Sequence, residues 1–218
     1  MHMNRWFFIT LCTLILISQI ALAEDTKTSE PEDFKMTLML PVNWSTPEKY
    51  NLVVSIPEGY RLIQSPAQLQ DAKTNLLEFI PKNEKEDQWS EIITINKYIG
   101  QSLSAKRITE FLKKSILERV KNGKVWKDEQ SKEKNYVFAS LGIAYDLNGK
   151  REVLGSRYYS GAYDCAGVQY TIRAKKDDSE EEIIAKIENF FETNTQIVAT
   201  TPTPTPTSKP AATSAPSP

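Results

Sequence analysis

The dipeptide Asn148-Gly149 constrains the fold more than any other feature of this sequence, because it lies between two long runs of strand-forming residues. Both residues accept the positive φ angles of a two-residue type I′ turn, so they predict a hairpin between strands at 136–147 and 150–160. In the predicted register, opposite charges meet beside the turn, which favours this pairing. The predicted cross-strand pairs are Asp146 with Arg151, Tyr145 with Glu152, and Ile143 with Leu154. The chain should therefore build an antiparallel sheet.

Short runs that are rich in β-branched residues, or that alternate with period two, indicate further strands. Each break between them contains a proline or glycine, which does not continue a strand ladder well; the breaks are at Pro41, 57–59, Pro66 and Pro81. The further predicted strands are at 35–40, 51–56, 60–63, 76–80, 91–99 and 167–174.

Two segments have the spacing of amphipathic helices. Ser104 can cap a helix that runs through Lys121, and Asn122-Gly123 offers a left-handed stop after it. The second helix begins at a capping box, in which Ser179 and Glu182 each bind an otherwise unpaired backbone N–H group. The apolar stripes, which we expect to pack in the core, are Ile108, Phe111, Leu112, Ile116 and Val120 in the first helix and Ile183, Ile184, Ile187, Phe190 and Phe191 in the second.

The order of these elements lacks the alternation of strand and helix that builds a parallel sheet. The expected fold is therefore α+β, an antiparallel β-sheet flanked by two main helices. A strand followed by Ile56-Pro57-Glu58-Gly59-Tyr60, a strand ending near Tyr98, a mid-chain helix, a meander and the final helix at 183–191 resemble the Mog1/PsbP-like α/β/α sandwich. That superfamily includes DcrB-type envelope proteins. The resemblance covers about residues 50–193 and implies a protein that binds or scaffolds partners, with no shared catalytic residues to transfer.

The first residues have the pattern of an export signal. Arg5 precedes an apolar core at 6–17, and Ala21-Leu22-Ala23 is the small-x-small pattern that a signal peptidase reads. We expect cleavage after Ala23, because the apolar core is shorter than the roughly 20 residues that cross a bilayer. An uncleaved anchor and lipidation at Cys12 are the alternatives. We therefore expect no membrane span after cleavage.

The last residues differ in composition from the rest of the chain. They alternate threonine with proline and contain no aromatic or large aliphatic residue, so they cannot form a core. The predicted organisation is a signal peptide at 1–23, a disordered segment at 24–34, a globular α+β domain at 35–198, and a Thr/Pro-rich disordered tail at 199–218. This layout is similar to that of genus-restricted proteins that Gram-negative pathogens export by type II secretion.

The chain offers few groups for catalysis. Its only histidine, His2, precedes the export signal, so the exported protein lacks the usual base of serine and cysteine triads and the usual zinc ligand. No phosphate-binding or metal-binding motif occurs, and we expect no cofactor and no metal. The chain has 27 Lys+Arg against 28 Asp+Glu, and this mixed charge predicts no nucleic-acid binding. Cys165 is the only cysteine left after cleavage, so we expect no internal disulfide.

One segment between two predicted strands concentrates the residue types that are enriched at binding hot spots. The candidate binding residues in it are Arg157, Tyr158, Tyr159, Tyr163 and Asp164. A structural role is the alternative, because tyrosines form strands readily, Cys165 is typical of a small buried residue, and Asp164 can fix a turn.

From the sequence we expect a secreted, monomeric, non-enzymatic binding protein, a host-directed or virulence-associated factor of a Gram-negative bacterium. Its partner would be an unknown protein or a component of the envelope or host surface. One alternative is a periplasmic scaffold or accessory protein of the envelope. Another is a glycan hydrolase that uses two carboxylates in place of histidine, chosen from Glu78, Glu91, Glu152 and Asp164; such an enzyme needs two of these acids to face one cleft.

Overall fold

The computed structural model describes residues 36–42, 49–63, 74–98, 103–132, 136–161 and 164–200, which all belong to the unit Asp33–Pro218. The predicted signal peptide at 1–23, the segment at 24–34 and the tail beyond Thr200 lie outside the described residues. No helix among the described residues is long and apolar enough to cross a membrane.

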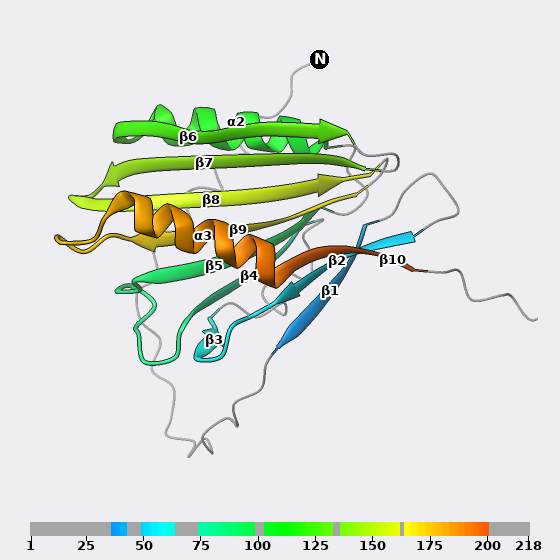
Figure 1. Cartoon of the computed structure of the whole chain (residues 1–218), viewed down its shortest axis with the longest axis horizontal. Helices are drawn as coiled ribbons and strands as arrows, with labels where there is room; N and C mark the ends of the chain where they lie inside the picture. The colour runs from blue at the N-terminus through cyan, green and yellow to red at the C-terminus, as the bar shows by residue number, and fades with distance from the viewer. Residues whose placement is uncertain are drawn as a thin grey trace, which may run out of the picture. The chain divides into compact units, whose positions relative to one another are not determined.

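Within the described part of the chain, the strands form two antiparallel sheets (Figure 1). The smaller sheet has the order β1-β2-β10 and contains β1 (Thr37–Val42), β2 (Lys49–Ser55) and β10 (Thr195–Thr200). The larger sheet has the order β3-β4-β5-β9-β8-β7-β6. Its strands are β3 (Tyr60–Leu62), β4 (Thr74–Pro81), β5 (Glu91–Tyr98), β6 (Lys121–Lys132), β7 (Val137–Leu147), β8 (Lys150–Ser160) and β9 (Cys165–Arg173).

The predicted hairpin is confirmed. Asn148 and Gly149 have φ angles of 52° and 76°, the left-handed values that a type I′ turn needs. The strands on either side are β7 and β8, and all three predicted cross-strand pairs occur in their register: Asp146 with Arg151, Tyr145 with Glu152, and Ile143 with Leu154.

Both predicted helix starts are also confirmed. Helix α2 (Ala105–Leu117) is capped by Ser104, whose side chain accepts a hydrogen bond from the Arg107 N–H. Helix α3 (Glu180–Asn194) is capped by Ser179, whose side chain accepts one from the Glu182 N–H. The first helix, however, ends before Lys121, where we expected it to end. Lys121 already begins strand β6, and Asn122 takes its positive φ of 50° in a β-bulge of that strand instead of at a helix stop.

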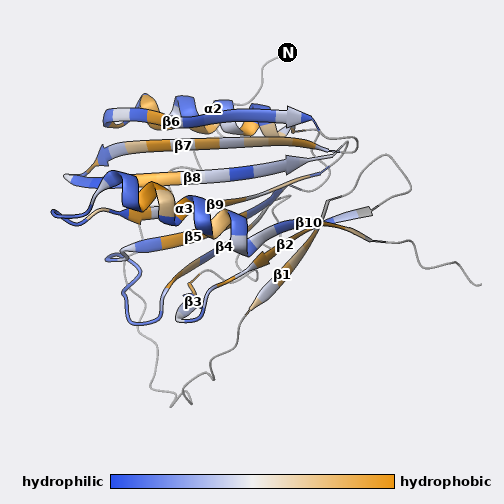
Figure 2. Ribbon diagram, in the orientation of Figure 1, coloured by the Kyte–Doolittle hydropathy of each residue, from blue (hydrophilic) through white to orange (hydrophobic). Residues whose placement is uncertain are grey.

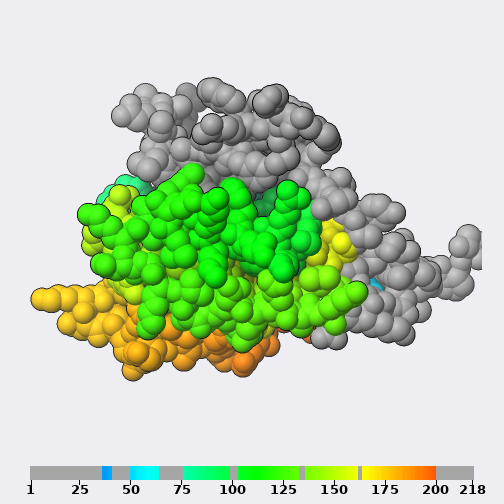
Figure 3. All heavy atoms as spheres, turned by 90° about the horizontal axis from the view of Figure 1, so that it is seen from above, coloured from blue at the N-terminus to red at the C-terminus, as the bar shows by residue number. Residues whose placement is uncertain are grey.

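The two helices cover opposite faces of the larger sheet. Successive residues of a strand point to opposite faces, and two neighbours in β8 show which helix covers which face. Leu154 belongs to a cluster that includes Leu112 of α2. Gly155 lies directly under Ile187 of α3: a Cβ added at Gly155 would approach the Ile187 side chain to 2.4 Å. In Figure 3 the green surface of α2 and β6 faces the viewer, and the orange surface of α3 lies along the lower margin.

The smaller sheet packs on the same face as α3, and the main core lies between them. Leu52 and Val54 of β2 are 0% exposed and belong to one cluster with Ile93, Val168 and Ile187. The expected α+β class, an antiparallel sheet flanked by two helices, is therefore confirmed, with a second small sheet as an addition.

The sequence patterns did not predict strands β6 and β10. Figure 2 shows β6 as mostly hydrophilic beside the more hydrophobic β7, and the residues of β6 are exposed except at its middle. Strand β10 directly follows α3 and ends at Thr200, so regular structure continues past Val198, where we placed the end of the domain.

Candidate functional site

The segment selected from the sequence lies in the middle of the larger sheet. Arg157, Tyr158 and Tyr159 belong to β8, Asp164 directly precedes β9, and Tyr163 lies outside the described residues. Both faces of β8 are covered, because α2 and α3 pack on opposite sides of it. Tyr158 is only 1% exposed and Tyr159 8% exposed. These two candidate binding residues are therefore buried within the sheet.

The hydroxyl of Tyr158 has partners within the sheet. The side-chain amides of Gln169 and Asn96 donate to it over 2.5 Å and 3.4 Å. Burial raises the pKa of Tyr158 well above its ordinary value, so the hydroxyl stays protonated. Gly167 lies against its ring, and a Cβ there would approach the ring to 2.1 Å. These contacts assign Tyr158 a structural role in the core.

Arg157 attaches α3 to the sheet. One of its terminal nitrogens donates to Glu188 of α3 over 3.2 Å, and its guanidinium lies 4.9 Å from the centre of the Phe191 ring. Lys127 of β6 donates to the same Glu188 carboxylate over 2.9 Å. One carboxylate of the helix thus binds two basic residues from different strands.

Asp164 and Cys165 lie at the buried end of β9. Their exposed fractions are 3% and 0%. Burial, and the negative charge of Asp164, raise the pKa of the Cys165 thiol far above its ordinary value. Burial lowers the pKa of the nearby Lys97, and Asp164 partly opposes this shift. Because the thiolate is the reactive form of cysteine, Cys165 is an unreactive core residue.

Three of the candidate carboxylates of a hydrolase, Glu78, Glu91 and Glu152, do not meet in one cleft. Glu152 of β8 lies on the α2 face and accepts a hydrogen bond from Arg173 over 2.9 Å. Arg173 in turn lies 3.5 Å from the centre of the Trp89 ring. Glu78 lies on the same face, but β9 and β5 separate β4 from β8, which corresponds to roughly 14 Å across the sheet. Retaining and inverting glycosidases hold their acids about 5–9.5 Å apart.

Glu91 lies on the opposite face, at the centre of a cluster of ionisable groups from three elements. Tyr60 of β3 donates to its carboxylate over 2.5 Å, Lys186 of α3 donates over 2.6 Å, and Tyr170 of β9 donates to the oxygen that Tyr60 also binds. These hydrogen bonds connect two strands and a helix to one acid. The side chain of Glu91 is 19% exposed.

Each ionisable group in this cluster keeps one protonation state at neutral pH. Burial would raise the pKa of Glu91, but the hydrogen bonds from Lys186, Tyr170 and Tyr60 lower it below its ordinary value. Burial and the neighbouring acid raise the pKa of Tyr60, and burial and Tyr60 raise the pKa of Tyr170. Glu91 is therefore ionised and the tyrosines are neutral donors at neutral pH. A general base needs a pKa near the working pH and a free lone pair, so this cluster is suited to holding α3 on the sheet.

The smaller sheet has a side that faces away from the core. Leu52 and Val54 point to the core, so Val53 between them points to the other side of the sheet, where it is itself only 8% exposed. The register places Met39 of β1 and Gln196 of β10 directly beside Val53. We call this side, which carries Met39, Val53, Gln196 and Val198, the outer face.

Exposed apolar side chains gather at this sheet. Met39 is 59% exposed and Val198 36%, and both lie on the outer face; Met36, which is 41% exposed, directly precedes β1. The other large hydrophobic residues that are exposed in the described part are Leu62 of β3 and Leu117 at the end of α2. Methionine is flexible and polarizable, which suits it to contacts with a partner surface.

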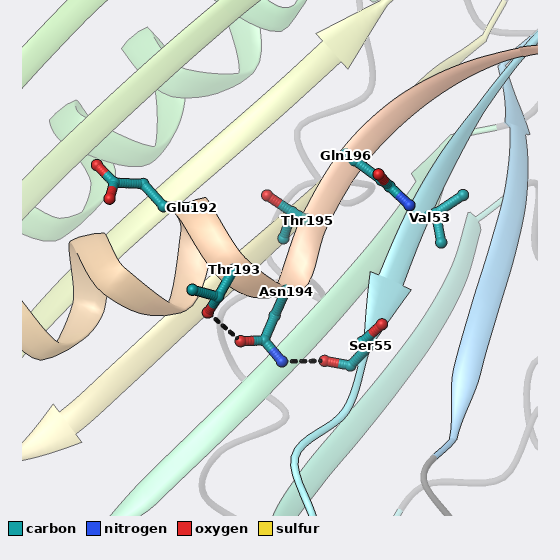
Figure 4. Close-up of a pocket in the computed structure, with 7 residues that line it drawn as sticks. All are labelled: Val53, Ser55, Glu192, Thr193, Asn194, Thr195 and Gln196. Carbon is teal, nitrogen blue, oxygen red and sulfur yellow. Dashed lines mark hydrogen bonds between the residues drawn. The ribbon is translucent and has the colours of Figure 1, made fainter.

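A small hollow adjoins the outer face where α3 ends (Figure 4). Its volume is about 110 Å³, against about 300–1,000 Å³ for pockets that hold small-molecule ligands. The Asn194 side chain donates to the Ser55 carbonyl over 3.0 Å and accepts from the Thr193 hydroxyl over 2.6 Å. The hollow is lined by Val53, Ser55, Glu192, Thr193, Asn194, Thr195 and Gln196.

Comparisons with known proteins give matches in structure only. No protein-family model matches the sequence, and no curated protein matches it. One similar structure is LpqN of Mycobacterium tuberculosis, described as involved in cell envelope biogenesis (15% identity, TM-score 0.43, 74% of this chain and 91% of that chain). A second is the cyanobacterial PsbP of Synechocystis (8% identity, TM-score 0.47, 78% and 98%). A third is the Ran-binding protein Mog1p of Saccharomyces cerevisiae (9% identity, TM-score 0.37, 64% and 78%). All three structures have identities of 15% or less and TM-scores below 0.5.

Proposed function

We propose that this protein is an exported, non-catalytic binding protein and that its protein partner docks on the outer face of the smaller sheet. The observation that carries the proposal is the exposure of Met39 and Val198 on one sheet face. Apolar side chains that are exposed to water cost free energy, and binding a partner recovers it.

The arrangement of the polar groups supports binding over catalysis. Glu152 is paired with Arg173, and Glu91 accepts three hydrogen bonds, so neither carboxylate is available to activate water. The hollow beside the outer face is large enough for about three or four waters or one partner side chain, but too small for a sugar chain.

A capture experiment with matched variants tests this function. The purified protein, Met39→Glu and Leu117→Glu would be immobilised and exposed to envelope and host-cell fractions. Leu117 is an exposed apolar residue at the end of α2, so its substitution controls for the general effect of a new surface charge. We expect Met39→Glu to lose a partner that both the unchanged protein and Leu117→Glu retain.

The same experiment can contradict the proposal. Equal capture by all three proteins would exclude the outer face as the docking surface. Turnover of glycan substrates that disappears in Glu91→Gln or Glu152→Gln, with the fold intact by circular dichroism, would establish the carboxylate hydrolase in its place. Comparison of culture supernatant with periplasm separates a released factor, which we propose, from an envelope accessory protein.

A further inference from the structure

The main-chain groups of β1 point alternately toward β2 and away from it. The Ile56 N–H donates to the Met36 carbonyl over 2.8 Å, so these two residues form a bonded pair. Bonded and non-bonded residues alternate along an antiparallel strand, so Thr37, Met39 and Pro41 turn their main-chain groups to the opposite edge. Pro41 has no N–H. The outer edge of β1 thus offers the N–H groups of Thr37 and Met39, and no strand in the described part of the chain pairs with it.

The size of the outer face limits what can occupy it. Three strands of about six residues span roughly 14 by 20 Å, or about 300 Å². A stable interface between two folded proteins buries about 800 Å² on each side. Packing against the outer face alone is therefore too small a contact for a second copy of this chain, whereas main-chain hydrogen bonds along an edge let a short segment bind through little area.

Of the two edges of the smaller sheet, β1 is the more accessible. Strand β10 continues directly from α3, and the helix packs against both β10 and β2. β1 lies on the far side of β2 from α3 (Figure 1). Its inward residues Leu38 and Leu40 are only partly buried at the margin of the core. A strand added beside β1 would cover these two leucines and the exposed side chain of Met39.

We propose that an extended segment of the partner protein, with apolar side chains at alternate positions, adds to the outer edge of β1 as a fourth strand. This inference rests on the proposed function and specifies the partner's form. Side chains on one side of the added strand lie against Leu38 and Leu40, and those on the other side lie beside Met39. The hydrogen bonds are made to Thr37 and Met39, so the bound stretch is about five residues long.

Amide hydrogen exchange with a synthetic peptide tests this proposal. The probe is a nine-residue peptide of alternating valine and threonine with lysine at both ends, and its control carries N-methyl groups on all of its valine and threonine amides, which removes the donors of both edges. We expect the unmodified peptide to slow exchange at Thr37 and Met39 and the N-methylated peptide to leave it unchanged. No slowing at saturating peptide, or slowing at Ile197 and Ala199 of β10 instead, would overturn the proposal.

Variants of the protein give a second test. Met39→Pro removes the outward N–H without touching the bonds to β2, and edge strands tolerate such prolines. Met39→Thr keeps the N–H and removes the apolar side chain, and Ala199→Pro removes the corresponding outward N–H of β10. We expect peptide binding to be lost in Met39→Pro, weakened in Met39→Thr and unchanged in Ala199→Pro. Equal binding by Met39→Pro and Met39→Thr overturns strand addition.

The two proposals can fail separately. If Met39→Glu loses the captured partner while the peptide protects neither Thr37 nor Met39, the outer face is the docking surface and the added strand is wrong. Peptide-induced dimers in analytical ultracentrifugation, with β1 of one copy protecting β1 of another, would make a second copy the occupant and would also overturn the proposal.

Discussion

At the scale of single residues, Glu91 connects three elements that are far apart in sequence. Its carboxylate binds Tyr60, Tyr170 and Lys186. Glu91→Gln keeps the shape but removes the charge, and we expect it to lower the free energy of unfolding at neutral pH by about 1–3 kcal/mol, because hydrogen bonds to a charged acceptor are stronger than those to a neutral one. Urea unfolding measures the change. Lys114→Ala, which removes an exposed pair with Glu118, is the control.

The same residue predicts a pH dependence. The pKa of Glu91 is lower in the folded protein than its ordinary value of about 4.3, so the unfolded chain takes up the proton first as the pH falls. The contribution of Glu91 is then complete above the ordinary pKa and is lost as the pH falls through the folded value. The difference in the free energy of unfolding between the unchanged protein and Glu91→Gln should therefore become smaller as the pH falls. A difference that stays constant from pH 7 to about pH 3 would contradict this.

Cys165 gives a prediction about reactivity. Since its side chain is fully buried and its pKa is raised, we expect a thiol reagent such as dithionitrobenzoate to leave the native protein unmodified at neutral pH and to react once urea has unfolded it. Rapid labelling under native conditions would show that the end of β9 opens, and would contradict the assignment of Cys165 to the core.

At the scale of elements, the turn between β7 and β8 requires positive φ angles. A β-branched residue at Gly149, where φ is 76°, has no clash with neighbours but cannot adopt this backbone easily. Gly149→Val should therefore lower the free energy of unfolding by about 1–2 kcal/mol. Lys150→Ala, at the exposed next position, should leave it nearly unchanged. Thermal unfolding of both variants measures this, and equal small effects would count against the type I′ turn.

Sequence patterns predicted the elements whose local chemistry agrees with their place in the fold. The hairpin at Asn148-Gly149 and the two serine caps are examples, since a turn or a cap depends on a few adjacent residues. Strand β6 was missed because an edge strand needs no apolar alternation, and its charged residues and two bulges protect that edge. Strand β10 was missed because six residues between a helix and a Thr/Pro segment have no pattern of their own.

The candidate surface could not be predicted for a related reason. Tyr158 and Tyr159 lie on adjacent positions of one strand, and only the placement of both helices on β8 shows that both faces are covered. For Met39 the strand itself, at 35–40, is predicted from the sequence. The exposure of the Met39 side chain, however, depends on which strand becomes the edge of the smaller sheet. That order is set by β10, which the sequence did not reveal.

At the scale of the whole molecule, the C-terminal strand defines where folding ends. Truncation after Thr200 removes only residues beyond β10, and we expect the melting temperature to stay unchanged. Truncation after Asn194 removes β10 and exposes the Leu52 side chain, which pairs in register with Ile197, so the melting temperature should fall by several degrees. Circular dichroism melts compare the two. A lower melting temperature after truncation at Thr200 would mean that residues beyond Thr200 dock on the domain.

Strand β2 pairs with β1 on one edge and with β10 on the other, so the smaller sheet joins nearly opposite ends of the folded chain. During synthesis β2 emerges well before β10, so its second partner becomes available only after the strands of the larger sheet and both helices have been made. Contacts of such long sequence separation form late and slowly. The smaller sheet, and with it the outer face, is therefore complete only after β10 has paired with β2.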